Sequence, residues 1–457
     1  MTNDTICALA TATGGAIGIV RISGCLSLEV LGRIFQASSQ NGGEFCANRI
    51  YYGRIVDTEG GVVDEVLVSV FHAPHSYTGE NVVEISCHGS HYILNVVLEL
   101  LIQQGCRMAN PGEFTQRAYL NGKMDLSQAE AVADLIASTN EATHHLAISQ
   151  LRGNFSSELY RLREKLLKLT SLLELELDFS DHEDLEFADR TELLDLARQT
   201  DDHISRLANS FHTGQAIKQG IPVVIVGKTN VGKSTLLNRL LRDDRAIVSD
   251  VHGTTRDTIE DTIDLHGVKF RFIDTAGIRQ TIDKVEQIGI SRTFAAINRA
   301  RIILWLIDEE PTAAECQEMQ EKVVGKSLII IQNKIDISSI VEEVNLPLLG
   351  SHFPFLQISA KNGTNIDELE ERIYQAANIP TLKNSDIIVT NVRHYEALMN
   401  AHTSLLRVID ALSQQLSSDL IAEDLRLTLS QLAEITGGQI TTDEVLSNIF
   451  KNFCVGK

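Results

Sequence analysis

The sequence predicts a multidomain chain that combines α/β and all-α parts. A β-branched run, 222–226, leads into a glycine-containing loop and then into an apolar helical pattern, which predicts a strand, a loop and a helix near the middle of the chain. Leucines recur at three- and four-residue steps over 159–173, which predicts a long helix with one buried face. The chain has 457 residues, which is too long for one hydrophobic core and suggests about three domains.

Composition narrows the classes of protein. The net charge of −21 weighs against non-specific binding to nucleic acid, but it leaves room for a local basic groove. The longest apolar run, Ile302 to Ile307, is far too short to span a bilayer, and the N-terminus lacks the features of a signal peptide. We therefore expect a cytoplasmic protein with no membrane partner. The seven cysteines contain no C-x-x-C pair, so the sequence indicates neither a zinc site nor a disulfide framework.

Residues 1–120 alternate strand-like runs, such as 17–22 and 63–71, with turns, and they predict an N-terminal α+β domain. The run Gly14 to Gly18 misses the G-x-G-x-x-G spacing of a dinucleotide loop and has no helical pattern behind it, so the turn interpretation is favoured. Glu84 lies among apolar residues of a predicted strand. Pattern alone favours a solvent-facing charge there over a ligand-binding role.

Residues 121–218 predict a helical domain, with helices over 129–148 and 155–177. The chain becomes helical again over 380–457, a segment that is too short to have much core of its own. We expect it to pack on the helices before residue 220. Residues 219–379 would then be inserted in the helical domain, with joints at 214–220 and near 377–384.

The central loop has the form G-x-x-x-x-G-K-S, with Gly227 and Gly232 at its glycine positions. A glycine-containing turn before an ordinary helix is the alternative, but the strand before the loop and the helix after it favour a phosphate-binding loop. Lys233 would neutralise the β- and γ-phosphates of a nucleotide, and the Ser234 hydroxyl would bind Mg²⁺. The contacts predicted in and beside the loop fall on Asn230, Val231, Gly232, Lys233, Ser234 and Thr235.

The rest of 219–379 alternates strand and helix patterns and predicts one doubly wound, mostly parallel sheet. Asn333-Lys334-Ile335-Asp336 follows a strand-like run, and the Asp336 carboxylate can accept two hydrogen bonds from guanine. Adenine offers an acceptor and no amine there, so the base is guanine. Backbone groups of Ser359, Ala360 and Lys361 would complete the base pocket.

Two further stretches would complete a GTP site of the Ras-like type. Asp274-Thr275-Ala276-Gly277 ends a strand-like run, and it places a carboxylate near Mg²⁺ and a backbone N–H near the γ-phosphate. Thr254 and Thr255 offer hydroxyls on a loop that can close over the phosphates. In Ras-like GTPases a Gln follows the D-T-A-G glycine and orients the attacking water, but Ile278 stands there in this chain. Glu286, or a cation near Asn230, is the candidate replacement.

Several stretches outside the nucleotide motifs carry a resemblance to a known family. They are 18–24 (GIVRISG), 77–84 (YTGENVVE), 111–118 (PGEFTQRA), 125–131 (DLSQAEA) and the C-terminal 453–457 (FCVGK). Together with the GTP motifs they resemble the MnmE (TrmE) family of tRNA-modification GTPases over nearly the whole chain. The family's Pro-Pro-Gly-type turn before the first strand is replaced here by Thr11 to Gly15.

The resemblance implies a function for the N-terminal domain. That domain would be folate-binding-like, would form a homodimer, and would bind a formyl-tetrahydrofolate through Arg21, Glu84, Lys123 and Lys457, which reverses the pattern-based interpretation of Glu84. It also implies a heterotetramer with MnmG (GidA), a flavin- and NADH-dependent partner. The complex adds a carboxymethylaminomethyl or aminomethyl group to the wobble uridine of certain tRNAs.

The resemblance also implies that K⁺ and contact between two GTPase domains activate hydrolysis. The K⁺ ligands would be Asn230, Ser249, Val251 and Thr254, and Mg²⁺ would be held by Ser234 and Thr255. Glu286, Lys233 and Thr255 would be catalytic. Cys454 matches a tail cysteine for which a chemical and a structural role are equally open.

Two alternatives to this function come from other classes. A regulatory GTPase of ribosome or RNA assembly would need only the motifs of 219–379. A folate-dependent methyltransferase would transfer a methyl group without a partner. The N-terminal domain and the Cys-Val-Gly-Lys tail favour the tRNA-modification hypothesis over the assembly factor.

Overall fold

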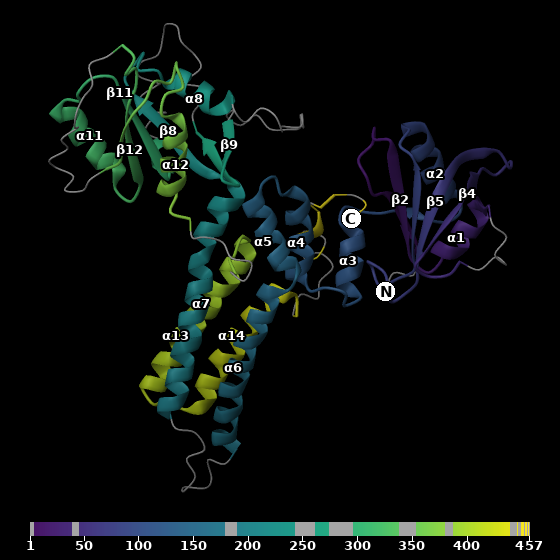
Figure 1. Ribbon diagram of the computed structural model, residues 1–457. Helices are drawn as coiled ribbons and strands as arrows, with labels where there is room; N and C mark the ends of the chain where they lie inside the picture. The colour runs from purple at the N-terminus through teal and green to yellow at the C-terminus, as the bar shows by residue number, and fades with distance from the viewer. Residues whose placement is uncertain are drawn as a thin grey trace. The chain divides into compact units, whose positions relative to one another are not determined.

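The computed structural model describes residues 4–38, 45–178, 190–242, 261–273, 296–337, 353–379 and 387–438, together with 446, 449–451, 453, 454 and 456 near the C-terminus. The chain separates into two compact units (Figure 1). Unit 1 contains Met1–Ala137, Ala147–Asp202 and Ala397–Lys457. Unit 2 contains Ser138–Leu146 and His203–Glu396.

The N-terminal part of unit 1 is a seven-stranded sheet with the order β3-β4-β5-β6-β2-β1-β7, antiparallel except for the β1–β7 pair. The strands are β1 (Ile6–Leu9), β2 (Ile17–Ser23), β3 (Phe35–Ala37), β4 (Arg49–Val56), β5 (Val62–Phe71), β6 (Val82–His88) and β7 (Arg107–Met108). Helices α1 (Ser27–Ile34) and α2 (His91–Gln103) cover one face, where Leu31 and Val97 pack with Val68 in a shared core. The alternation of buried and exposed residues along the strands therefore follows the predicted period of two.

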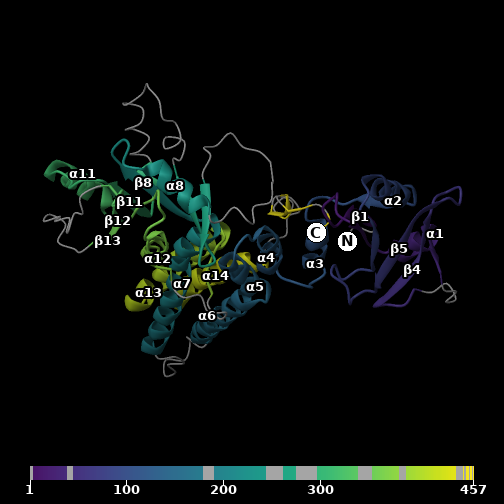
Figure 2. The ribbon, with the colours of Figure 1, turned by 45° about the horizontal axis from the view of Figure 1, so that its top comes forward.

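The remaining elements of unit 1 are helical. The helices that lie in it wholly or in part are α3 (Glu113–Leu120), α4 (Leu126–Ala137), α5 (Glu141–Leu151), α6 (Asn154–Asp178), α7 (Arg190–Gln219), α13 (Val392–Ser413) and α14 (Ser418–Thr436). The predicted leucine stripe of α6 is buried at all five positions, from Leu159 to Leu173. Helix α14 lies alongside α6 (Figures 1 and 2), and Arg426 of α14 pairs with Glu174 of α6. The predicted packing of C-terminal helices on helices before residue 220 is confirmed there.

One predicted helix is two helices in the structure. The pattern over 129–148 predicts a single helix, but α4 ends at Ala137 and α5 begins at Glu141. The Asn140 side chain accepts a hydrogen bond from the Thr143 backbone N–H at 2.9 Å, which caps the start of α5. The prediction was wrong because an apolar period does not reveal a cap inside the run.

Unit 2 is built on a six-stranded sheet with the order β13-β12-β11-β8-β10-β9, parallel except for the β9–β10 pair. Its strands are β8 (Ile221–Gly227), β9 (Asp261–Leu265), β10 (Val268–Phe272), β11 (Ile302–Ile307), β12 (Ser327–Gln332) and β13 (Phe355–Gln357). Its helices include α8 (Lys233–Arg242), α11 (Ala313–Val323) and α12 (Ile366–Ala376).

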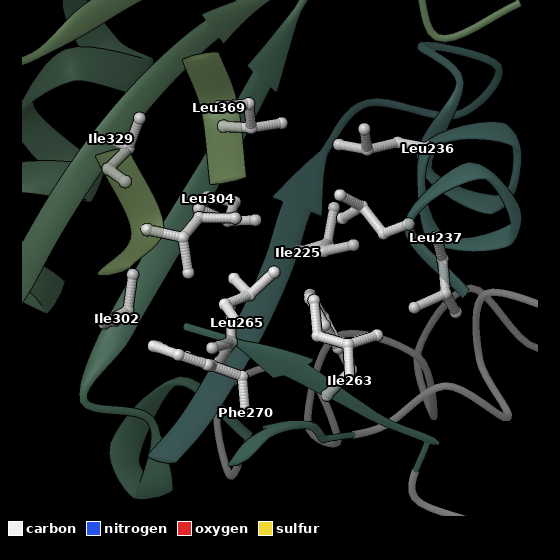
Figure 3. Close-up of a cluster of buried hydrophobic side chains, with 14 of the residues drawn as sticks. Ile225, Leu236, Leu237, Ile263, Leu265, Phe270, Ile302, Leu304, Ile329 and Leu369 are labelled. Atoms are coloured by element: carbon white, nitrogen blue, oxygen red, sulfur yellow. The ribbon is translucent and has the colours of Figure 1, made fainter. Parts of the chain in front are cut away.

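Both faces of this sheet are buried. Ile225 and Leu304 pack with Leu236 of α8 and Leu369 of α12 on one face (Figure 3). The next residues along the strands, such as Trp305, point to the opposite face and pack with Met319 of α11. Helices on both faces of a mostly parallel sheet agree with the predicted doubly wound fold, and burial on both faces explains the continuous apolar runs of β8, β11 and β12.

Helix α7 leads directly into the six-stranded sheet of unit 2. It ends at Gln219, Gly220 follows with φ of 87°, and β8 starts at Ile221. Gly214, at the start of the predicted joint, lies inside α7 instead of between elements. A Cβ on Gly214 would lie 2.2 Å from the Val389 carbonyl oxygen, so this glycine permits a close approach within unit 2 and does not end the helix.

Among the described residues, no helix combines the length and apolarity that crossing a membrane requires.

Candidate functional site

The phosphate-binding loop lies between β8 and α8, as predicted. Gly227, Asn230 and Gly232 have φ angles of 153°, 64° and 103°, in the region that favours glycine. A Cβ on Gly227 would lie 2.4 Å from the Leu306 carbonyl oxygen, and a Cβ on Gly232 would lie 2.2 Å from Nδ2 of Asn333. Both glycines are therefore required by close packing as well as by backbone conformation.

The Lys233 ammonium lies across this loop. It donates to the carbonyl oxygens of Gly227 at 2.8 Å and Lys228 at 2.6 Å. Burial lowers the pKa of Lys233, because a charged amine loses solvation there. Val231 is fully buried, the Ser234 side chain is partly exposed at the first turn of α8, and Asn230 and Thr235 are exposed. The inner side of the loop is therefore buried, and its outer side is polar and lies at a helix N-terminus. This arrangement fits a polyphosphate and Mg²⁺.

One buried amide ties the loop to the predicted base pocket. Asn333 is 3% exposed and follows β12. Its Nδ2 donates to the Val231 carbonyl at 2.8 Å, and its Oδ1 accepts from the Ala360 backbone N–H at 3.0 Å. The sequence motif predicts Asn333 near the base, but it does not predict that this side chain holds two distant loops together.

The carboxylate predicted to read the base is positioned by a neighbouring hydroxyl. Ser359 is buried and donates through Oγ to Oδ1 of Asp336 at 2.8 Å, while Asp336 itself is exposed. Lys334 adopts a φ of 66° and its amine pairs with Asp308 at 3.0 Å. Lys361 is exposed beside them. An oriented carboxylate beside the phosphate loop fits a base that presents two N–H donors, as guanine does.

Several predicted site residues lie outside the described residues. They are Ser249, Val251, Thr254, Thr255, Asp274, Thr275, Ala276, Gly277 and Glu286. Of the two predicted Mg²⁺ ligands, Ser234 is described.

A second candidate site lies on the N-terminal sheet of unit 1. Arg21 of β2 and Glu84 of β6 are cross-strand partners, and the Glu84 carboxylate accepts from Nε of Arg21 at 2.9 Å and from Nη2 at 2.8 Å. The guanidinium carbon lies 5.5 Å from the centre of the Tyr77 ring and 5.6 Å from that of Phe114. This planar cation between aromatic rings was not predicted from the pattern of the strands.

The C-terminal tail reaches the same place. Nη1 of Arg21 donates to the Gly456 carbonyl at 3.1 Å, and the Gly112 backbone N–H donates to the Cys454 carbonyl at 3.3 Å. Cys454 is exposed. The Lys123 amine donates to the Pro74 carbonyl at 3.0 Å instead of contacting Arg21 or Glu84. The structure therefore brings Arg21, Glu84 and the tail together, gives the Lys123 amine a partner in the Pro74 carbonyl, and does not describe Lys457.

A charged cluster supports this part of the sheet. Arg117 is 4% exposed and its guanidinium contacts the carboxylates of Asp4, Glu80 and Glu113 at 2.8 to 3.2 Å. Ser23, two residues beyond Arg21, donates to Glu80 at 2.7 Å. Burial opposes ionisation of Glu113, but hydrogen bonds from Arg107, the Asn110 N–H and Arg117 lower its pKa below the ordinary range.

Comparison with known proteins shows that the parts of the chain that carry the two candidate sites match models of the same family. The family model described as the TrmE N-terminus of a GTP-binding protein matches residues 5–123, and the one described as the MnmE helical domain matches residues 126–454. The tRNA modification GTPase MnmE of Bacteroides thetaiotaomicron is 53% identical over 100% of both chains. That of Flavobacterium johnsoniae is 50% identical over 99% of both.

A solved structure of Aquifex aeolicus Era aligns with 40% of this chain and 66% of its own, at 26% identity and a TM-score of 0.26. The resemblance predicted from short motifs is confirmed by the two family models and by the relatives that match over the full length. The chain belongs to the MnmE family of tRNA modification GTPases.

Proposed function

We propose that the chain binds GTP through the loop of unit 2 and hydrolyses it in a cycle that serves the modification of the wobble uridine of tRNA with a carboxymethylaminomethyl or aminomethyl group. The observation that carries the nucleotide assignment is the convergence of the loop, Asn333, Ser359 and Asp336 on one edge of the sheet. Mg²⁺ and GTP phosphates fit the loop because its amides, the Lys233 amine and the Ser234 hydroxyl complement their charge.

The choice of base follows from Asp336. A carboxylate held by Ser359 accepts from the two donors of guanine, while adenine leaves it desolvated and unpaired. Mismatches of this kind reach about 10⁴-fold in discrimination. Lys334 and its partner Asp308 would flank the base, with backbone groups of Ala360 and Lys361 beside it.

Hydrolysis needs groups beyond the described residues. We propose that Thr255 completes the Mg²⁺ shell, that Thr254 and residues 274–277 contact the phosphates, and that Glu286 orients the attacking water. A K⁺ ion held by Asn230, Ser249, Val251 and Thr254 would supply the positive charge that other GTPases take from an arginine.

The Glu286 assignment separates binding from chemistry. Glu286→Ala is expected to retain GTP affinity and to lower kcat by about 100-fold in K⁺, the loss typical of a positioned catalytic group. Single-turnover hydrolysis in K⁺ and in Na⁺ measures this. Equal rates for variant and parent in K⁺ would transfer the role to another group, and equal parent rates in the two salts would remove K⁺ from the mechanism.

For unit 1 we propose a formyl-tetrahydrofolate site at Arg21 and Glu84, with Lys123 and Lys457 as further contacts. The Glu84 carboxylate suits the N–H and amine donors of a pterin, and the Arg21 guanidinium, which lies against two aromatic rings, suits a folate carboxylate. A homodimer through the N-terminal domain, a heterotetramer with MnmG and a cytoplasmic location complete the proposal. We further propose four domain segments, 1–120, 121–218, 219–379 and 380–457, and either a chemical or a structural role for Cys454.

Complementation tests the function directly. A strain that lacks this gene is expected to lose the wobble-uridine modification in nucleoside analysis of its tRNA, and the parent gene is expected to restore it. Lys233→Ala is expected to fail, because the phosphates lose their buried cation. Lys228→Ala is the matched control, since that lysine lies in the same loop but its amine pairs with Glu309, which is exposed, and with Glu315, which is partly buried. Normal tRNA nucleosides with defective ribosome profiles in the deleted strain would favour the assembly-factor alternative.

A further inference from the structure

Unit 1 contains a groove that the two sites above do not use. It has a volume of about 890 Å³ and is lined by residues of α6 and α14 and by Asp125 just before α4. Helices α6 and α14 run side by side there, as Figures 1 and 2 show. The volume falls in the range of pockets that hold ligands of nucleotide size.

The charged side chains that line the groove are mostly basic. Three arginines line it, Arg161 and Arg163 from α6 and Arg426 from α14, against one carboxylate, that of Asp125. Asp125 accepts from the Gln128 backbone N–H at 2.9 Å and so caps the start of α4. A basic lining on a chain with a net charge of −21 indicates a local preference for anions.

The arginines are available to a ligand. Arg161 pairs with Glu158 at 2.9 Å and Arg426 pairs with Glu174 at 2.7 Å, and their own side chains remain 74% and 63% exposed. The Arg426–Glu174 pair is exposed on both sides, and such pairs contribute about 0 to 1 kcal/mol, so a phosphate can replace the Glu174 carboxylate at little cost. The Glu158 side chain is 13% exposed, so Arg161 is the more firmly held of the two arginines. Arg163 is exposed, and no ion pair of Arg163 with another described residue is present.

Polar and aromatic groups lie beside the arginines. The Ser156 hydroxyl oxygen is buried in the groove lining without a hydrogen-bond partner among the described residues. The Tyr160 side chain is 59% exposed and also lines the groove. Guanidinium groups for phosphates and an aromatic ring for stacking are groups that RNA backbones and bases use.

We propose that the groove between α6 and α14 binds the phosphodiester backbone of an RNA. The choice of RNA as the polyanion rests on the proposed function, in which tRNA is the substrate. The arginine forks contact phosphate oxygens, and Tyr160 stacks on a base or ribose at the groove.

Binding of an unmodified tRNA transcript to the full-length chain tests the proposal. Fluorescence anisotropy from about 50 to about 200 mM salt gives the Kd and its salt dependence. The triple variant R161Q/R163Q/R426Q is expected to bind about 10-fold or more weakly and to lower the log–log salt slope by about 3, because each lost phosphate contact removes roughly one counterion. Arg163→Gln alone, which breaks no ion pair between described residues, is expected to shift the slope by about 1.

Arg372→Gln is the matched control. Arg372 is an exposed arginine of α12 in unit 2 that pairs with Glu368 within its own helix, so its loss removes one positive charge away from the groove. It is expected to leave RNA affinity unchanged. Every variant is expected to keep the parent's thermal melting and its basal GTP hydrolysis, because no substitution touches the nucleotide loop.

Three outcomes overturn the proposal. They are parent-like RNA affinity and salt slope in the triple variant, no RNA binding by the parent chain, and binding of polyglutamate in preference to tRNA at equal charge. The last outcome would assign the groove to an acidic protein segment. Failure of the proposed function is a separate result, since it is measured as unaltered tRNA nucleosides in the deleted strain and not as RNA affinity.

Discussion

The two candidate binding sites are built in different ways. In unit 2 the candidate nucleotide site is centred on the backbone of one short stretch, 227–234, where a Cβ on Gly227 or Gly232 would meet Leu306 or Asn333. In unit 1 the Arg21 site is assembled from side chains of β2, β6, α3 and the loop at Tyr77, and from a tail residue 435 positions away. A backbone site tolerates changes of side chain except where a Cβ does not fit, whereas an assembled site depends on each partner.

Gly232→Ala tests the backbone site with the largest expected effect. The new Cβ meets an Asn333 amide that cannot move without breaking its bonds to Val231 and Ala360, and φ of 103° is strained for alanine. We expect GTP affinity to fall by about 100-fold or more, since strain and lost hydrogen bonds together cost about 3 kcal/mol. Titration with a fluorescent GTP analogue measures it.

Gly325→Ala is the control for that variant. Gly325 also has a positive φ, 76°, but a Cβ there meets nothing within 4 Å. It is expected to lose some stability and to keep GTP affinity. Equal losses of affinity in the two variants would show that backbone strain alone, without the Asn333 contact, explains the effect.

Asp336→Asn probes the one side chain on which base choice depends. The amide presents a donor where the carboxylate presented an acceptor, so guanine binds about 100-fold more weakly and xanthine binds better. Competition between GTP and xanthosine triphosphate reports the change. Asp367→Asn, in the exposed first turn of α12, is the control. An Asp336→Asn variant that still prefers GTP would contradict the guanine assignment.

Arg21→Lys tests the assembled site with a smaller expected effect. Lysine keeps the charge but loses the two-pronged contact with Glu84 and the bond to the Gly456 carbonyl. We expect formyl-tetrahydrofolate to bind about 10-fold more weakly in equilibrium dialysis, a loss of about 1.4 kcal/mol.

Arg54→Lys is matched to it, because Arg54 also makes a cross-strand pair, with Glu65, on exposed surface of the same sheet. It is expected to leave folate affinity unchanged. Equal folate affinity in the two variants would place the ligand elsewhere.

Glu113→Gln has the smallest expected effect and acts on the support of the assembled site. Because the folded state lowers the pKa of Glu113, its ionised form stabilises the fold at neutral pH, and that contribution is lost as the pH falls below about 4. The variant is expected to lose about 1 kcal/mol at pH 7 and to approach the parent in acid. Urea unfolding at both pH values decides this.

Glu29→Gln is its control, since Glu29 pairs with Arg33 in an exposed position of α1. We expect it to change the free energy of unfolding by less than about 0.5 kcal/mol at either pH. A Glu113→Gln variant as stable as this control at pH 7 would show that the charged cluster contributes nothing.

The sequence determined the features that depend on neighbouring residues. The phosphate loop, the strand before it, the base motif and the buried leucine stripe of α6 follow from short spacings and from periods of two and of 3.6 residues, which act over one turn or one strand. The two-faced burial of the unit 2 sheet follows from runs such as Ile302 to Ile307. Full-length identity with relatives then extends the motif-based prediction to the family.

Only the tertiary structure decided which distant residues pack against these helices, strands and loops. It showed that Asn333 bonds to Val231 and Ala360, that Arg21 holds the tail, that Gly214 lies inside a helix, and that the arginines of α6 and α14 line one groove. A periodic pattern encodes that a residue faces a core or a surface, but it carries no information on the distant segment that packs there. Glu84 illustrates the limit, since its alternation along β6 is the same whether its face meets water or Arg21.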